Sequence, residues 1–309
     1  MDKTESLLIN LPSVIAAFGY GSGIKKQLNY SSESLKTTMD DYILIVENSR
    51  EWHKKNILMN KEHYTLSRRL VIPNMPRFME VMGTGVTFIP GLPYKDVPNK
   101  FYKIGVVAFS DFKEELITWN SLALAGRLSK PILKIKSSKE VDNLIEQNRN
   151  SVLIVSLLLL EENSVDSLLK KICSLSFYGD VRSNGFENPN KISNIVYGNY
   201  EELYDLYIRK NKYFQVMLDK KIIINYEELL LDFYNLPNKL LEYVCSNTSD
   251  ISELQELKSC INQFIYNLNF SCSLKLSIKS FVTTGLFASL SYLVQKRKKA
   301  KVHILTNQK

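Results

Sequence analysis

The 309-residue sequence has few cysteines and histidines, and their positions argue against two kinds of site. The cysteines are Cys173, Cys245, Cys260 and Cys272, and the histidines are His53, His63 and His303. The cysteines form no CxxC pair or short framework, so we expect reduced thiols rather than a disulfide scaffold. The histidines form no HExxH or similar grouping, so we do not expect a structural zinc ion.

A leader peptide and a long apolar run are also missing from the sequence. The opening "MDKTESLLINLPS" carries two acids, whereas a cleavable transit peptide is basic and acid-poor. We therefore expect a prokaryotic chain, a mature form or import by an internal signal. The most apolar segment, "SVLIVSLLLLEEN", is shorter than the roughly 20 residues that span a bilayer, so we expect a buried helix there.

The charge of the chain is unbalanced toward the basic side. Forty Lys and Arg face 32 Asp and Glu, a formal net charge of +8, while 45% of the residues are hydrophobic. This composition suits a chain with a sizeable core. The excess positive charge favours an anionic partner, which can be a nucleotide, a nucleic acid or a membrane surface.

The periodicity of apolar residues predicts an α+β fold. The segment "SVIAAF" at 13–18 is expected to be a strand or a buried segment, and strands are expected in "DDYILIVEN" at 40–48 and "FYKIGVVAF" at 101–109. "EWHKKNILMNKEHYTLSRRL" and "DFKEELITWNSLALAGRL" read as helices, each ended by proline. Beyond about residue 200 the glycines thin out and helical patterns dominate, so we place a soft domain boundary there.

Glycines cluster in "AAFGYGSGIKKQ", residues 16–27, before a basic segment. A P-loop and a dinucleotide-binding fingerprint both need glycine five residues after Gly19, where Ile24 stands. The Gly-Ser turn at 21–22 still suits a phosphate group if a helix begins at 23–30, because glycines allow close backbone approach and helix-start N–H groups point at the anion. An ordinary turn is the alternative.

An acidic pair, Asp40 and Asp41, opens the expected strand at 40–48. Since side chains alternate along a strand, Asp41 shares a face with Ile43, and Asp40 points away. A Gly-Ser turn followed by strand acids resembles the polymerase-β type of nucleotidyltransferase, although Ile43 stands where that superfamily has a second acid. We expect Asp41 to bind a metal ion; the second ligand stays open, and Asp180 is a candidate. A solvated strand edge is the alternative.

Several blocks in the same order resemble the family of mitochondrial-type phosphatidate cytidylyltransferases, also called CDP-diacylglycerol synthases. These blocks are "FGYGSGIKKQ", "DDYILIVEN", "EWHKKNILMNKEHYTLS", "YKIGVVAF", "WNSLALAGRLSKPI", "LSFYGDVR", "ENPNKISNIV" and "KSFVTTGLFASLSYLVQK". The resemblance implies a magnesium-dependent reaction of CTP with phosphatidic acid. It also implies a polymerase-β-type nucleotidyltransferase domain at 1–200, a mostly helical, winged-helix-like domain at 201–274 and a membrane-binding tail at 275–309.

Carried onto matching positions, the resemblance implies roles for individual residues. The nucleotide-binding candidates are Gly21, Ser22, Gly23, Lys103, Arg127 and Lys130. The phosphatidate-binding candidates are Arg182 and Lys191, the catalytic candidates are Asp41 and Asp180, and the Mg²⁺ ligands are Asp41, Asp40 and Asp180. Solvated surface is the alternative for each cation. His53 and His63 are either packed side chains or substrate contacts.

The last part of the sequence predicts a basic amphipathic helix. Apolar residues recur at helical spacing, "KRKK" follows, and no acid appears between Lys275 and Lys301. Such a helix lies in the interface of an anionic membrane, although packing on the protein core is the alternative. The membrane-binding candidates are Phe281, Leu286, Leu290, Lys296, Arg297 and Lys298. We expect a peripheral protein on the matrix side of the mitochondrial inner membrane, or on the cytoplasmic face of a bacterial membrane.

Two other functions compete with the lipid nucleotidyltransferase. A nucleotidyltransferase with an RNA or small-molecule acceptor would suit the positive charge, but the aromatic and basic pattern of nucleic-acid binding is missing, so no nucleic-acid partner is expected. A non-enzymatic membrane tether would leave Ser22 and Asp41 replaceable. The sequence does not predict the oligomeric state.

Overall fold

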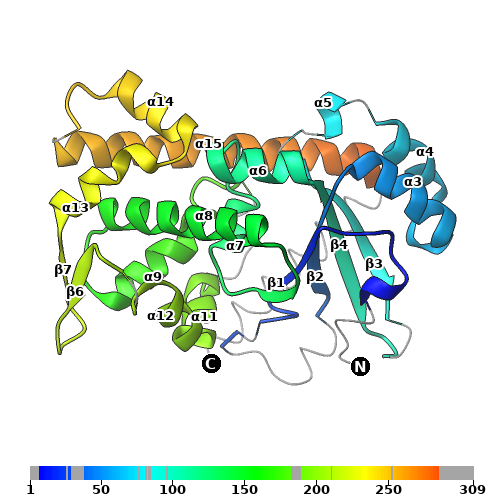
Figure 1. The fold of residues 1–309 in the computed structure, drawn as a ribbon, viewed down its shortest axis with the longest axis horizontal. Helices are drawn as coiled ribbons and strands as arrows, with labels where there is room; N and C mark the ends of the chain where they lie inside the picture. The colour runs from blue at the N-terminus through cyan, green and yellow to red at the C-terminus, as the bar shows by residue number, and fades with distance from the viewer. Residues whose placement is uncertain are drawn as a thin grey trace.

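The computed structural model describes residues 7–25, 27–28, 38–75, 77–80, 82, 85–94, 97–181, 189–209, 211–251 and 253–284. Its fold is α+β, with a five-stranded mixed sheet and many helices (Figure 1). Figure 1 shows α3 and α4 at the right-hand end, the β6–β7 hairpin at the left-hand end, and α15 running between the two ends.

The sheet has the order β3-β4-β2-β1-β5. Its strands are β1 (Ala16–Tyr20), β2 (Asp40–Val46), β3 (Thr87–Pro93), β4 (Phe101–Ala108) and β5 (Leu133–Lys136). The pair β2–β4 is parallel and the other pairs are antiparallel. The three predicted strands are confirmed. Strand β2 lies at the centre of the sheet and is buried on both faces, which explains its continuous apolar run.

Alternate residues of β2 face two separate hydrophobic clusters. Ile43 and Ile45 belong to the larger cluster, and Tyr42 and Leu44 belong to the smaller one. The larger cluster also takes in α6 (Phe109–Thr118), α7 (Ala125–Leu128), α8 (Lys139–Leu158) and α9 (Val165–Ser174). The smaller cluster lies under α3 (Ser49–Met59), the 3-10 turn η1 (Lys61–His63) and α4 (Leu66–Asn74), which α5 (Arg77–Glu80) follows.

Three helix predictions were wrong in detail. The helix predicted at 51–70 is divided into α3 and α4, because the chain leaves α3 at Asn60 and passes through η1, and Pro73 lies inside α4 instead of ending it. The predicted helix at 111–128 is two helices, because Trp119 ends α6 in the left-handed conformation, with φ of 54°. The helix expected from 23–30 does not form in residues 23–25 and 27–28, which make turns. The buried helix predicted from "SVLIVSLLLLEEN" is confirmed, since the second half of α8 is almost wholly buried.

The chain beyond residue 190 is mostly helical. Its elements are α11 (Lys191–Gly198), α12 (Tyr200–Tyr207), β6 (Phe214–Val216), β7 (Ile222–Ile224), α13 (Tyr226–Leu231), η2 (Phe233–Asn235), α14 (Asn238–Asn247) and α15 (Leu254–Thr284). The larger hydrophobic cluster continues through these elements to Ile265, so buried contacts cross the expected boundary at 200. The division into domains stays a prediction.

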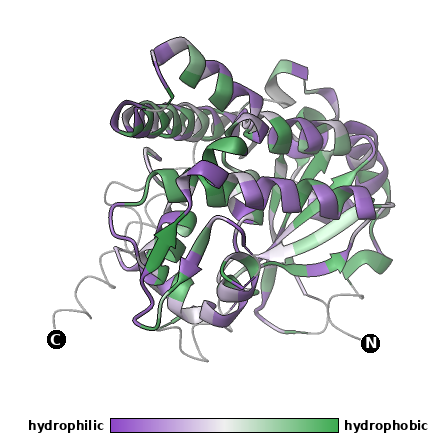
Figure 2. Ribbon diagram, turned by 60° about the vertical axis from the view of Figure 1, so that its left-hand side comes forward, coloured by the Kyte–Doolittle hydropathy of each residue, from purple (hydrophilic) through white to green (hydrophobic). Residues whose placement is uncertain are grey.

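Helix α15 is long and amphipathic. Hydrophobic and hydrophilic residues alternate around it (Figure 2), and its buried stripe includes Leu257, Ile261 and Ile265. It continues past residue 275, where the sequence analysis begins the tail. The side chain of Phe281 and residues Leu286, Leu290, Lys296, Arg297 and Lys298 lie outside what the structure describes. Among the described residues, no helix combines the length and apolarity needed to span a membrane.

The cysteines are free thiols, as the sequence predicts. Cys173, Cys260 and Cys272 are buried, and Cys245 is exposed. Burial raises the pKa of the Cys173 thiol to about 11, so this group stays protonated at neutral pH.

Candidate active site

The glycine turn lies directly against the start of β2. Tyr20, the last residue of β1, pairs with Asp41, so the turn that follows begins beside the acids. Gly21 has φ of 75°, which glycine adopts at little cost. A Cβ atom on Gly21 would lie 3.2 Å from Oδ2 of Asp41, and one on Gly23 would overlap the Met39 carbonyl oxygen. The close approach therefore depends on both glycines, and it puts the half-buried Ser22 between them.

The segment after the glycine turn is tied to the second half of the chain. The Lys25 N–H donates to the Gly21 carbonyl (2.8 Å), which closes the turn. The Lys25 ammonium pairs with Glu202 of α12 (2.8 Å), and the Leu28 N–H donates to the Asn194 carbonyl of α11 (3.1 Å). These contacts fix the turn without the helix that the sequence predicts.

The two acids of β2 project to opposite faces of the sheet. Asp40 lies with the smaller cluster, where its Oδ1 pairs with Lys100 (2.7 Å) and its Oδ2 accepts from the Tyr94 hydroxyl (2.9 Å). Burial, together with its hydrogen bonds to Tyr42 and Asp40, raises the pKa of Tyr94 and keeps it a donor. Asp40 is therefore held by neighbouring side chains away from Asp41.

Asp41 lies on the other face, between two strands that place charged and aromatic groups beside it. Directly opposed residues share a face, and Asp41 opposes Tyr20 on β1 and Lys103 on β4. The Lys103 ammonium pairs with Asp41 Oδ1 (2.7 Å) and lies 5.0 Å from the ring centre of Phe88. Burial alone would lower the pKa of Lys103, but Tyr20 and Asp41 outweigh it and raise that pKa, so the ammonium stays charged.

Arg127 completes this group of side chains. Its guanidinium carbon lies 5.4 Å from the ring centre of Tyr20 and 5.8 Å from that of Phe88. The Tyr20 side chain is buried, and among the described residues its hydroxyl has no hydrogen-bond partner. A buried hydroxyl without a partner marks a place where a ligand or water atom is needed. Sequence reasoning missed Tyr20 and Phe88, because only the sheet register reveals that they flank the acid.

A buried carboxylate positions the short helix that carries Arg127. Glu115 of α6 accepts from the backbone N–H groups of Leu124 (2.6 Å) and Ala125 (3.4 Å), which begin α7. Burial raises the pKa of Glu115 to about 7, although these N–H groups act against the rise. A Cβ atom on Gly126 would overlap the Ser176 side chain, so α7 packs tightly against the loop after α9.

Two further cations gather around Phe177 in that loop. The Lys130 ammonium lies 4.8 Å, and that of Lys191 4.1 Å, from the ring centre of Phe177. Lys130 also donates to the Gly126 carbonyl (2.5 Å) and to the Ser176 hydroxyl (2.9 Å). Burial and the nearby charges of Lys191 and Arg127 lower the pKa of Lys130 to about 8. Two neighbouring cations around one ring make a place for an anion.

The remaining predicted acid, Asp180, is buried at the end of the same loop. Helix α15 holds this loop, because Asn269 donates to the carbonyls of Leu175 and Tyr178 (both 2.7 Å) and Ser273 accepts from the Val181 N–H (3.2 Å). The predicted phosphatidate contact Arg182 lies outside the described residues.

The donor set of the site fits a magnesium ion at one position. Asp41 presents Oδ2 to the glycine turn, and Mg²⁺ commonly takes one or two carboxylates and completes its shell with substrate phosphates and water. Within the described part of the chain, no three or more His, Cys, Asp or Glu side chains are grouped to hold a metal ion. The metal roles of Asp41, Asp40 and Asp180 all stay predictions.

The histidines that the sequence left open belong to a buried polar network on the Asp40 side of the sheet. His53 Nδ1 and the Tyr64 hydroxyl are 2.8 Å apart, and Asn56 donates to the same hydroxyl (3.0 Å). Asn60 donates to Asn56 (2.8 Å), whose own amide nitrogen lies 3.4 Å from His63 Nδ1. Burial lowers the pKa of His53 to about 3, so it stays neutral and packs α3 against η1.

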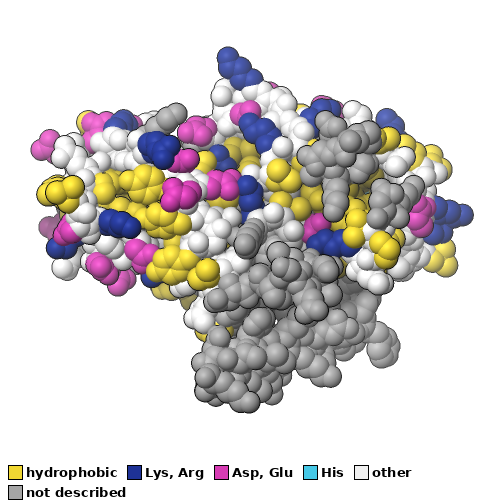
Figure 3. All heavy atoms as spheres, turned by 90° about the horizontal axis from the view of Figure 1, so that it is seen from below, with side chains coloured by type: hydrophobic (Ala, Val, Ile, Leu, Met, Phe, Trp, Pro, Cys, Tyr) yellow, Lys and Arg dark blue, Asp and Glu magenta, His cyan; other side chains and the backbone are white. Residues whose placement is uncertain are grey.

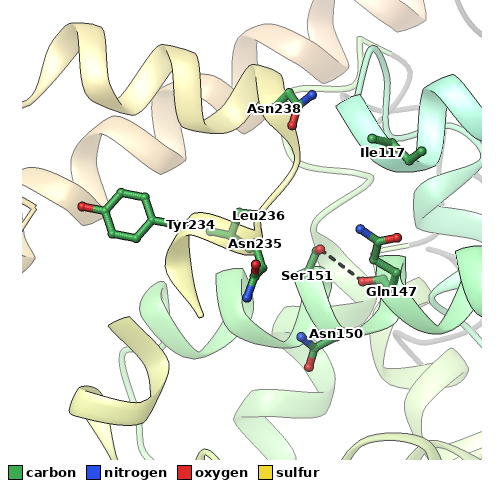
Figure 4. Close-up of a pocket in the computed structure, with 8 residues that line it drawn as sticks. All are labelled: Ile117, Gln147, Asn150, Ser151, Tyr234, Asn235, Leu236 and Asn238. Atoms are coloured by element: carbon green, nitrogen blue, oxygen red, sulfur yellow. Dashed lines mark hydrogen bonds between the residues drawn. The ribbon is translucent and has the colours of Figure 1, made fainter. Parts of the chain in front are cut away.

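A separate pocket of about 420 Å³ is shown in Figure 4. Its lining comes from α6, α8 and the η2–α14 connection, and consists of Ile117, Gln147, Asn150, Ser151, Tyr234, Asn235, Leu236 and Asn238. None of the predicted site residues lines it, and it offers amides and hydroxyls but no charged group. The pocket therefore does not include the side chains gathered around Asp41.

Comparison with known proteins identifies the family of this chain. The family described as "Phosphatidate cytidylyltransferase, mitochondrial" matches residues 4–299. The chain is 34% identical to the protein of that name from Caenorhabditis elegans over 268 residues, which cover 82% of this chain and 80% of the relative. It is 28% identical to the Xenopus laevis protein, covering 91% and 88%, and 31% identical to the Saccharomyces cerevisiae protein, covering 78% and 60%. The chain belongs to the mitochondrial phosphatidate cytidylyltransferase family.

Proposed function

We propose that this chain transfers the CMP group of CTP to phosphatidate, giving CDP-diacylglycerol and pyrophosphate. Family membership supports the substrate pair. One observation in this chain carries the chemistry: the glycine turn lies against Asp41, and Lys103 pairs with that acid on the same face. An RNA acceptor and a non-enzymatic tether have no comparable observation in their favour.

The reaction needs positioning and charge neutralisation rather than a covalent enzyme intermediate. A phosphate oxygen of phosphatidate attacks the α-phosphorus of CTP, and the bond from that phosphorus to the oxygen bridging to the β-phosphate breaks. Pyrophosphate leaves with the electron pair. Because both substrates are anions, the chain's main contribution is to hold them in line and offset their charge.

The triphosphate is assigned to the group of side chains around Asp41. The glycine turn at residues 21–23 lies against this acid, and the lack of a Cβ atom at Gly21 and Gly23 leaves the backbone open to a phosphate group. The unpartnered Tyr20 hydroxyl supplies one more hydrogen bond, and Arg127 and Lys103 supply positive charge. Asp41 would hold Mg²⁺, which neutralises phosphate charge and polarises the α-phosphate when bound.

The phosphatidate headgroup is assigned to the neighbouring cations. Two observations support this choice. Lys130 and Lys191 both contact the Phe177 ring, and the charge of Arg127 is near enough to lower the pKa of Lys130. Placed there, the headgroup would meet the α-phosphate at the border of the two groups of cations. Arg182 is proposed as a third contact from the resemblance alone.

The finer fold and the location follow the family in this proposal. Residues 1–200 are proposed as a polymerase-β-type nucleotidyltransferase domain, supported by the Gly-Ser turn beside an acid on the adjacent strand. Residues 201–274 are proposed as winged-helix-like, supported by the β6–β7 hairpin among helices. The protein is proposed to act peripherally on the matrix side of the mitochondrial inner membrane, bound partly through the 275–309 tail.

An assay of the purified chain tests this function. The chain is incubated with labelled CTP, phosphatidate in mixed micelles and Mg²⁺, and lipid products are separated. We expect labelled CDP-diacylglycerol with one pyrophosphate released per product, and much less product when UTP or ATP replaces CTP. Equal use of the three nucleotides would overturn the cytidine assignment, and the absence of lipid product from folded protein would overturn the reaction.

A further inference from the structure

The right-hand end of the molecule exposes several large apolar side chains. They lie on α3, α4 and α5, with exposed fractions of 86% for Leu58, 56% for Met59, 73% for Leu66, 65% for Leu70 and 67% for Phe78. Single exposed hydrophobic residues are normal, but a group of them on neighbouring helices marks an interaction site. This group lies outside the site described above.

The helical register explains why these side chains face outward. On α3, the residues that pack inward are Trp52, His53 and Asn56. On α4, Arg68 and Ile72 are buried, whereas Leu66 and Leu70, four residues apart, share the opposite face. The fold is complete without burying these leucines, so their exposure reflects a surface rather than a gap in the core.

Cations accompany the apolar residues. Lys54 and Lys55 lie on the exposed side of α3, and Lys61 follows in η1. Lys54 is paired with Glu51, whereas Lys55 and Lys61 have no ion pair among the described residues. Figure 3 shows basic and hydrophobic side chains close together at the right-hand edge of the molecule, the end that carries α3 and α4. A surface with both leucines and unpaired lysines complements an anionic lipid interface.

The course of α15 supports the same partner. This helix packs against α4, and Thr284 is its last described residue (Figure 1). The basic amphipathic segment predicted from the sequence follows Thr284 in the chain, so the helix that contacts α4 is continuous in sequence with the predicted membrane-binding tail.

We propose that Lys55, Leu58, Lys61, Leu66 and Leu70, here called the α3–α4 surface, dock on an anionic membrane independently of the 275–309 tail. The leucines enter the headgroup region, and the lysines contact lipid phosphates. The surface follows the C-terminal end of β2, whereas Asp41 lies near its N-terminal end. The surface therefore holds the protein on the membrane and takes no part in the chemistry. This inference rests on the proposed function only in one respect: docking helps the protein because its proposed substrate lies in the membrane.

Vesicle binding of the full-length chain tests the proposal. The Leu58→Ser, Leu66→Ser, Leu70→Ser triple variant is compared with a Leu218→Ser, Leu231→Ser control, whose leucines are 107% and 73% exposed elsewhere. On vesicles of phosphatidylcholine and phosphatidylglycerol we expect the triple variant to lose about tenfold in partitioning, and the control less than about twofold. A Lys55→Glu, Lys61→Glu variant should lose binding at low salt, with a smaller loss at high salt. Unchanged partitioning of the triple variant would overturn the proposal.

A fluorescent label distinguishes direct insertion from an indirect effect. In a Cys245→Ser background, which removes the exposed thiol, Leu66→Cys and Leu218→Cys are each labelled with a polarity-sensitive dye. Anionic vesicles should shift the emission of the Leu66 label to the blue and leave the Leu218 label unchanged. Absence of the shift at position 66 would overturn docking by this surface and move the weight to a protein partner.

The activity assay separates this inference from the proposed function. In detergent micelles, the triple leucine variant should retain wild-type CDP-diacylglycerol synthesis, because docking is not needed there. On vesicles its rate should fall in proportion to the bound fraction. Loss of activity in both systems would contradict the separation of docking from chemistry, whereas an inactive wild type with normal vesicle binding would affect the proposed function alone.

Discussion

At the scale of single residues, Asp41 differs from Asp40 although the two are adjacent in the sequence. Strand alternation sends Asp40 to Lys100 and Tyr94, and sends Asp41 to Lys103 and the glycine turn. Lys103 balances the charge of Asp41 in the free protein. If a divalent ion bound to Asp41, it would balance that charge instead, and the Lys103 ammonium would be free to contact phosphate. We therefore propose Asp41 as the metal ligand.

Replacing Asp41 by Asn tests that assignment. The substitution keeps the shape of the side chain but removes the negative charge, so we expect CDP-diacylglycerol synthesis to fall on the order of 100-fold or more, with little change in fold. Steady-state assays at several Mg²⁺ concentrations measure the loss. Asp219→Asn, at an exposed ion-paired aspartate of the β6–β7 connection, is the matched control. Wild-type activity of Asp41→Asn would contradict the metal assignment.

The Tyr20 hydroxyl gives a second prediction at this scale. Tyr20→Phe removes one oxygen that has no partner among the described residues, so stability should stay the same or rise slightly. If the hydroxyl binds the nucleotide, KM for CTP should rise roughly two- to tenfold, the effect of one hydrogen bond. Thermal unfolding and CTP titrations measure both. A loss of stability with unchanged KM would mean that the hydroxyl serves the fold instead.

The lowered pKa of Lys130 predicts that activity toward phosphatidate depends on pH. Burial lowers its pKa to about 8, so the free enzyme loses this cation as pH rises through about 8. If the ammonium binds the phosphatidate headgroup, kcat/KM for phosphatidate should fall above that pH, because this ratio reports on the free enzyme. Lys130→Arg keeps the charge and should remove that part of the fall.

The same pKa shift also predicts how the stability of the protein changes with pH. Since the folded pKa is lower than the unfolded one, the unfolded chain binds more protons between about pH 8 and 10.5, and the cost of burying the cation is relieved as pH rises through this window. Comparing the unfolding free energies of wild type and Lys130→Met across this window checks the sign. We expect the unfolding free energy of wild type to rise relative to that of Lys130→Met as pH rises through the window. A fall of wild type relative to the variant would contradict the lowered pKa of Lys130.

At the scale of elements, α15 supports the loop that carries Phe177. Asn269 donates to two carbonyls of the segment 175–178, which also presents Phe177 to the lysines. Asn269→Leu leaves both carbonyls without this donor, so we expect a loss of roughly 1–3 kcal/mol in unfolding free energy. We also expect the substitution to raise the KM for phosphatidate more than the KM for CTP. Chemical denaturation and kinetics measure the two effects.

The control for this prediction lies two residues away on the same helix. Asn267 is exposed and hydrogen-bonds only along α15, so Asn267→Leu should change neither quantity noticeably. If Asn267→Leu and Asn269→Leu behaved alike, the effect would come from helix hydrophobicity and not from loop support.

Elements also show which parts of this fold are readable from sequence. The apolar run of β2 and the buried half of α8 were predictable, because periodicity and length decide them. The break in the helix at Trp119 was not predictable, since it depends on the Glu115 side chain accepting a hydrogen bond from the Leu124 N–H, which lies beyond the end of α6. The absence of a helix at 23–25 and 27–28 has a similar cause: contacts with α11 and α12 hold that segment.

The candidate site was predictable to a different degree. The glycines and acids carry a local pattern, and the cations lie in blocks that resemble the family. The neighbours Tyr20 and Phe88 came only with the strand register, which pairs residues far apart in the chain. Sequence spacing also gave no means to decide between packing and substrate contact for His53, which the structure places in a buried network.

At the scale of the whole molecule, one hydrophobic cluster connects the sheet to the helices after residue 200. It contains Phe18 and Ile43 of the sheet and also Leu229, Leu240 and Ile261. We therefore expect a single cooperative unfolding transition, seen alike by tryptophan fluorescence and by far-ultraviolet circular dichroism. Two separated transitions would instead support independently stable domains divided near residue 200.

The central claim is that the triphosphate of CTP and its divalent ion meet between the glycine turn and Asp41. The most direct test is a crystal structure with CTP and Mn²⁺ in place of Mg²⁺, located by anomalous scattering. We predict a manganese peak within coordination distance of an oxygen of Asp41, with phosphate oxygens against residues 21–23. A manganese peak bound elsewhere, with the triphosphate away from this turn, would contradict it.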